Sequence, residues 1–213
     1  MKDIYYGRSE VSNSDLSELK KWLYPSYGYH DPTMVYRFGN LIDCMITESY
    51  KVNYSMNTCD GILFLDADFE RANIMRRSYF KDEFCRKLLE QCTPQKIMSN
   101  PNQEFETDGY KYFLPTRCKW DLWADSVKWG GDIKSTAATS QKGFEDAARH
   151  FDYDRQRYFY MNLAGSKQDV LIGISKVNFK IFKIFIKEGD DFYNSGKEKT
   201  LDLTFKYWQL FAS

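Results

Sequence analysis

The sequence has few of the residues that build covalent or metal cross-links. It contains five cysteines and two histidines in 213 residues, and no two cysteines form a C-x-x-C pair. Because zinc and iron–sulfur sites need closely grouped Cys and His ligands, this scatter argues against such a cluster. An odd number of dispersed cysteines is typical of a cytosolic chain with free thiols.

Long apolar runs are also missing. No stretch reaches the roughly 18 apolar residues that a membrane helix needs, and the first six residues lack the apolar core of a signal peptide. Thirty Lys and Arg balance thirty Asp and Glu, which argues against a basic protein that coats nucleic acid but leaves room for a local basic groove. We therefore expect a cytoplasmic protein with no membrane partner.

Hydrophobic residues make up 43% of the chain, enough for one domain over residues 1–213. Residues 1–100 are expected to be largely helical, with a first helix that Asn13 or Ser14 caps and Pro25 closes, and with further helices over 34–48 and 66–92. Residues 101–213 are expected to carry the sheet, beginning with a hairpin at Asp108-Gly109. The further expected elements are strands at 115–124 and 130–136, a helical region at 140–163 interrupted near 151–152, strands at 170–177 and 179–186, and a helix at 190–211. This order predicts a mixed α/β (α+β) fold with a central mixed sheet flanked by helices.

The window from Asp121 to Lys134 carries the chemistry of greatest interest. Asp132 and Lys134 are two residues apart on an expected strand, so they share one face, and a hairpin can bring Asp121 beside them. Two adjacent carboxylates repel each other unless a cation intervenes, and oxygen ligands select Mg²⁺ or Mn²⁺. The carbonyl of Ile133 is a further candidate ligand. The alternative is an Asp–Lys pair on a solvated hairpin, because D-x-K is a common tripeptide.

Three other residues are candidate substrate contacts. Gln156 and Tyr160 share a face at positions i and i+4 of an expected helix, where an amide and a phenol suit phosphate or base contact. Lys119 lies two residues before Asp121 and can contact phosphate. Ordinary helix packing and a rim charge are the respective alternatives.

Together, the ordered motifs resemble the PD-(D/E)XK nuclease superfamily, most closely its RecB, exodeoxyribonuclease VIII and phage lambda exonuclease-like branch. The residues that carry this resemblance are Asp121, Asp132-Ile133-Lys134 and Gln156-x-x-x-Tyr160. The serine-rich segment 12–17 and the segment 37–43 support it. The resemblance covers about residues 12–49 and 104–211. It implies a restriction-endonuclease-like core in which the metal is held by Asp121, Asp132 and the Ile133 carbonyl. The family's metal-facing His is replaced by Asp43, which either adds an oxygen ligand or leaves that ligand missing.

The resemblance implies a catalytic set of Asp121, Asp132 and Lys134, with Gln156, Tyr160 and Lys119 on the substrate. The implied activity is Mg²⁺- or Mn²⁺-dependent hydrolysis of DNA phosphodiesters, most simply by an exonuclease of phage or mobile-element recombination and repair. It leaves room for a homo-oligomer and for a recombination partner protein. The rival interpretations are a non-catalytic DNA-binding or assembly protein on the same fold, and a structural domain whose D-x-K residues lie on the surface without a catalytic role.

Overall fold

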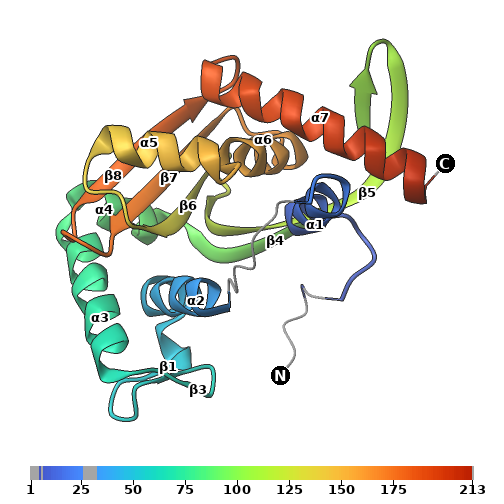
Figure 1. Ribbon diagram of the computed structural model, residues 1–213. Coiled ribbons are helices and arrows are strands. Elements are labelled where there is room, and N and C mark those ends of the chain that lie inside the picture. Colours follow the sequence, from blue (N-terminus) through green and yellow to red (C-terminus); the bar gives the residue numbers. More distant parts are fainter. Residues whose placement is uncertain (1–4, 6, 26–32, 213) are drawn as a thin grey trace.

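A five-stranded mixed sheet forms the centre of the computed structural model, which describes residues 5, 7–25 and 33–212 (Figure 1). Its strands follow one another across the sheet in chain order, and only β6 and β7 run parallel. The strands are β4 (Thr93–Thr107), β5 (Tyr110–Ala124), β6 (Trp129–Thr136), β7 (Gln168–Ser175) and β8 (Ile181–Lys187). The expected mixed α/β class is confirmed.

Helices cover both faces of the sheet. One layer holds α1 (Asn13–Leu23), α5 (Gln141–His150), α6 (Tyr153–Ala164) and α7 (Asp191–Phe211); the other holds α2 (Thr33–Thr47), α3 (Asp66–Lys81) and α4 (Glu83–Gln91). Side chains along β7 point alternately to the two faces of the sheet and so contribute to two hydrophobic cores. Leu171 packs in the cluster beneath α5–α7, while Val170 and Ile172 pack with α2 and α3. Within the described ranges, we find no helix with the length and apolarity to cross a bilayer.

The first hundred residues are less uniformly helical than expected. A 3₁₀ turn, η1 (Ser49–Lys51), leads into a small antiparallel sheet, and β4 already begins at Thr93. The strands of this sheet are β1 (Val52–Asn53), β2 (Thr58–Cys59) and β3 (Ile62–Leu63). Each has only two residues, too few for an alternating pattern to be recognised in the sequence.

The expected helix over 66–92 is wrong as a single element. Asp82 adopts an extended conformation between α3 and α4, and its side chain accepts the Cys85 N–H at 3.0 Å as an N-cap. Its other oxygen binds Lys183 Nζ of β8 at 2.6 Å. The expected caps of the first helix are also wrong: Ser12 caps α1 in a reciprocal capping box with Asp15.

Two turn predictions are confirmed. Asp108 and Gly109 have φ values of 52° and 80° and join β4 to β5, which is the left-handed pair that a two-residue hairpin turn requires. The helical region after residue 140 breaks at Asp152, whose φ is 55°. Such a left-handed residue cannot continue an α-helix, so α5 and α6 are separate helices.

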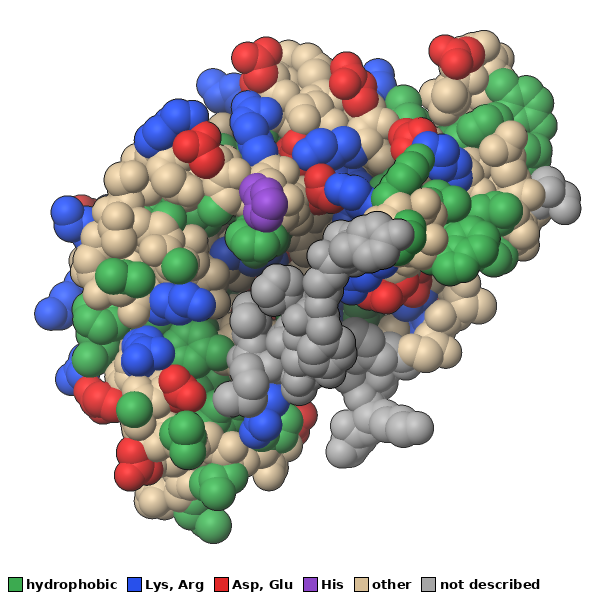
Figure 2. All heavy atoms as spheres, in the orientation of Figure 1, with side chains coloured by type: hydrophobic (Ala, Val, Ile, Leu, Met, Phe, Trp, Pro, Cys, Tyr) green, Lys and Arg blue, Asp and Glu red, His purple; other side chains and the backbone are tan. Residues whose placement is uncertain are grey.

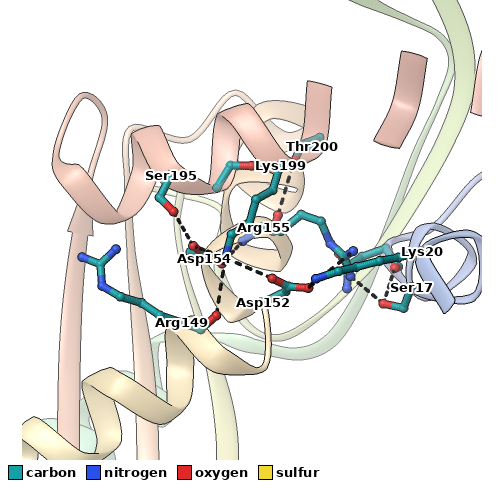
Figure 3. Close-up of polar contacts among 11 residues, drawn as sticks. Ser17, Lys20, Arg149, Asp152, Asp154, Arg155, Ser195, Lys199 and Thr200 are labelled. Carbon is teal, nitrogen blue, oxygen red and sulfur yellow. Dashed lines mark hydrogen bonds and ion pairs between the residues drawn. The ribbon is translucent and has the colours of Figure 1, made fainter. Parts of the chain in front are cut away.

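A polar network fastens α6 between α1 and α7 (Figure 3). Asp152 pairs with Lys20 of α1 and, at 3.0 Å, with Lys199 of α7. Lys199 also lies 2.8 Å from the buried Asp154, and Arg155 donates through Nε to Asn13 Oδ1 at 3.1 Å. Helix α6 is therefore held at its N-terminal end by ionic contacts from both neighbours.

Asp152→Asn tests this network through pH. Burial alone would raise the pKa of Asp152, but hydrogen bonds from Lys20 and Lys199 outweigh burial and lower it. A lowered folded pKa stabilises the protein above the unfolded value of about 4, and the contribution is lost as pH falls through the folded value. In urea unfolding from about pH 6 to pH 3, the wild type should lose more stability than the Asp152→Asn variant. Asparagine is chosen because it tolerates the left-handed backbone at this position.

The matched control is Asp146→Asn, an exposed carboxylate of α5 paired with Lys142. It should keep the wild-type pH profile. Identical profiles for the wild type and Asp152→Asn would contradict the role given to Asp152.

Candidate functional site

The candidate site begins where β5 and β6 separate. The two strands pair only from Ala124–Trp129 to Leu122–Gly131. At the next position Asp121 replaces the missing backbone partner, and its Oδ2 accepts the Ile133 N–H at 2.8 Å. The residue alternation of β5 is interrupted there as well, because Trp120 and Trp123 both pack in the core beneath α6. The separation therefore fixes Asp121 between the strands.

Asp132 and Lys134 project from β6 toward the same side, as their spacing predicts. Lys134 Nζ lies 2.5 Å from Asp132 Oδ2. Burial lowers the pKa of Lys134, but the nearby Asp132 and Asp121 carboxylates outweigh burial and raise it above its ordinary value. With these neighbours Lys134 is an ammonium ion that serves as a counter-charge to two carboxylates.

Asp43 joins this cluster from the opposite helical layer. It lies on α2, which packs against β5 and β6. Burial, followed by the influence of Cys44 and Asp132, raises the pKa of Asp43 to about 6, while Lys134 opposes the shift. Asp43 and Asp132 also raise the pKa of Asp121 well above its ordinary value, behind burial as the first cause. The three carboxylates thus act on one another electrostatically around Lys134.

Arg157 is the central residue that the sequence analysis missed. Its side chain is fully buried on α6, with Nη1 2.5 Å from Asp132 Oδ1 and Nε 2.7 Å from Asp169 Oδ2. The guanidinium carbon lies 4.7 Å from the Trp120 ring centroid and 4.5 Å from that of Tyr160. The sequence offered two signs of this ion pair: Arg157 lies inside the Gln156–Tyr160 motif, and Asp169 stands at the start of an apolar strand.

The remaining expected residues lie around this centre. Gln156 is half-buried, and its Oε1 has no hydrogen-bond partner among the described residues. Tyr160 is buried against Trp120, with ring centroids 5.4 Å apart, so a packing role is visible and substrate contact stays a prediction. Lys119 is half-buried on β5 opposite Ile97. Ile133 contributes its amide to Asp121, and the role of its carbonyl stays a prediction.

The site holds more acidic than basic side chains. Asp43, Asp121, Asp132 and Asp169 face two cations, Lys134 and Arg157. Burial raises the pKa of Asp169 to about 7 despite the Arg157 contact. No three His, Cys, Asp or Glu side chains of the described residues form a ready metal-binding group. The donors nevertheless fit a hard cation, because they are carboxylate oxygens whose mutual repulsion a divalent ion would relieve.

Removal of Arg157 should be strongly destabilising. Arg157→Met leaves Asp132 and Asp169 without their shared cation, and breaking a buried ion pair from one side costs about 3–5 kcal/mol. Urea unfolding measures the loss. Adding Asp169→Asn should recover part of it, whereas Arg86→Met, which removes an exposed pair with Glu90, should cost under about 1 kcal/mol. A small loss in Arg157→Met would refute the central role of this ion pair.

Gly130 provides a packing test of the same region. A Cβ added at Gly130 would lie 2.1 Å from the Trp120 ring, whereas one at Gly39 of α2 would meet nothing within 4 Å. Gly130→Ala should therefore cost about 1–3 kcal/mol in thermal unfolding. Gly39→Ala should gain up to about 1 kcal/mol, as expected in a helix interior. Equal effects of the two substitutions would show that Trp120 does not constrain the strand.

Comparisons with known proteins place the chain by its fold. No protein-family model and no curated protein sequence matches it. Its structure is similar to a protein from Eubacterium rectale provisionally assigned as an exonuclease, with 18% identity, a TM-score of 0.57, and coverage of 89% of this chain and 71% of the other. A phage-related exonuclease from Haemophilus somnus 129PT matches at 11% identity and a TM-score of 0.41, over 94% of this chain and 84% of the other. The first of these establishes a shared fold.

Proposed function

We propose that the protein is a divalent-metal-dependent DNA nuclease of the PD-(D/E)XK type, acting as an exonuclease. The observation that carries this proposal is the convergence of Asp121, Asp132 and Lys134 where β5 and β6 separate, with Asp43 added from α2. The fold shared with a protein provisionally assigned as an exonuclease supports it. A role in phage or mobile-element recombination is part of the same proposal.

In this proposal Asp121, Asp132 and Asp43 hold Mg²⁺ or Mn²⁺, with the Ile133 carbonyl as a further ligand. A bound divalent ion supplies a more acidic water and stabilises charge on a phosphoryl group. Lys134 orients the attacking water and neutralises the reacting phosphate. Arg157 contacts Asp132 Oδ1, so that the other carboxylate oxygen, Oδ2, pairs with Lys134. Any cation bound by Asp132 thus competes with the Lys134 ammonium.

Gln156, Tyr160 and Lys119 are proposed to orient the DNA. Of the three, Gln156 has the strongest support, because its buried Oε1 lacks a partner among the described residues and a buried polar atom gains from one. Figure 2 shows Lys and Arg scattered among Asp and Glu over the face in view, with no single basic patch. Because thirty basic residues balance thirty acidic ones, binding to DNA should be modest and sensitive to salt, unless an oligomer or partner protein holds the DNA.

Asp132→Asn and Lys134→Ala test the catalytic assignment. Each should abolish cleavage of end-labelled linear DNA in Mg²⁺ or Mn²⁺, because one removes a ligand charge and the other removes the cation beside the reacting phosphate. Asp146→Asn and Lys142→Ala are the matched controls, since this exposed pair lies on α5, and both should cleave as the wild type does. Thermal unfolding checks that each variant is folded.

The substrate set separates the proposal from its rival. Linear, nicked and circular DNA are incubated with Mg²⁺, Mn²⁺ or EDTA. An exonuclease degrades the linear form, begins at the nick, spares the closed circle and stops in EDTA. Wild-type protein that binds DNA but cleaves none of the three would favour a non-catalytic binding or assembly protein. The closed ion contacts of Asp132 with Arg157 and Lys134 are the observation that keeps this rival in view.

A further inference from the structure

Gln95 has an unusual backbone conformation for a residue inside a strand. Its φ is 55°, a left-handed value that costs a non-glycine residue about 1–2 kcal/mol. Its neighbours keep the ladder with β5, since Pro94 pairs with Leu122 and Lys96 with Trp120. Gln95 therefore faces Asp121, and an unfavourable conformation lies directly beside the candidate site.

The contacts of Gln95 account for this conformation. Its Nε2 donates to Asp43 Oδ2 at 2.9 Å and to Thr47 Oγ1 at 3.0 Å. Thr47 Oγ1 in turn lies 3.2 Å from Asp43 Oδ1 and donates at 2.8 Å to the Asp43 carbonyl. The amide of a strand residue thereby reaches across to α2 and fixes the orientation of a carboxylate that belongs to the other layer.

We propose that Gln95 is a positioning residue that holds Asp43 in the orientation needed to bind the metal beside Asp121. This inference rests on the proposed function. Its physical basis is that an outer hydrogen bond fixes the rotamer of a ligand, and that losing such a bond typically weakens metal binding about 10- to 100-fold. The left-handed backbone is the condition under which the Gln95 amide reaches α2.

Gln95→Gly separates this role from simple stabilisation. Glycine adopts a φ of 55° without strain, so the relief of strain offsets the lost contacts and the midpoint of thermal unfolding should change little. Binding of Mn²⁺ and of Mg²⁺ to the full chain, measured by calorimetry without DNA, should weaken at least about tenfold. DNA cleavage should need a correspondingly higher metal concentration for its half-maximal rate.

Two further variants complete the test. Gln95→Asn tolerates left-handed backbone but is one methylene too short to reach Asp43, so it should reproduce the loss of metal affinity. Asn57→Gly is the matched control: Asn57 precedes β2, has a φ of 51°, and donates an amide hydrogen bond to the Asp66 carboxylate of α3 at 2.8 Å. It should leave metal affinity unchanged.

The outcomes distinguish this inference from the proposed function. Unchanged metal affinity in both Gln95 variants, with a wild type that binds metal and cleaves DNA, would overturn the positioning role alone. A wild type that neither binds Mn²⁺ or Mg²⁺ nor cleaves DNA would overturn the nuclease proposal and the inference with it. An equal loss of affinity in Asn57→Gly would reduce the effect to general destabilisation and refute the positioning role.

Discussion

The buried ion pair system of Arg157 is the interaction on which the site and the surrounding packing depend. One guanidinium neutralises Asp132 and Asp169 from adjacent strands while its faces contact the rings of Trp120 and Tyr160. Two carboxylates could not be buried here without such a cation, because desolvating an unpaired charge is prohibitive. The contact between Arg157 and Asp132 also fixes the orientation of the Asp132 carboxylate toward Lys134. The same ion pair thus determines both the packing of the core and the geometry of the site.

The site is built from irregularities in an otherwise regular sheet. β5 and β6 stop pairing after Leu122–Gly131, so the Ile133 N–H has no strand partner and donates its hydrogen bond to Asp121 instead. Gln95, in the facing position of β4, adopts a left-handed conformation and reaches Asp43. Regular strands would place these groups in ladder hydrogen bonds or in the apolar core. Departures from ideal geometry are therefore where polar chemistry enters this molecule.

Local patterns carried the fold prediction, and long-range contacts limited it. The strands expected at 115–124 and 130–136, the Asp108-Gly109 turn and the break near Asp152 are found in the structure, because each depends on neighbours in sequence. The interruption at Asp82 was missed because it depends partly on Lys183 of β8. In the site, D-x-K spacing predicted the shared face of Asp132 and Lys134. Arg157, Asp169 and Gln95 belong to no local pattern, since their partners are distant in the chain.

The chain-order arrangement of the sheet has a consequence for how its topology is assembled. Each strand pairs with the strand that precedes or follows it, so most closures needed for the sheet join nearby segments and carry a small loop entropy. Such local pairing lowers the contact order that slows folding. The closures that bring α2 to β5 and β6, and with it Asp43 to Asp121, join segments much further apart in the chain. The carboxylate that completes the cluster thus comes from a helix distant in sequence from the strands that carry the other two.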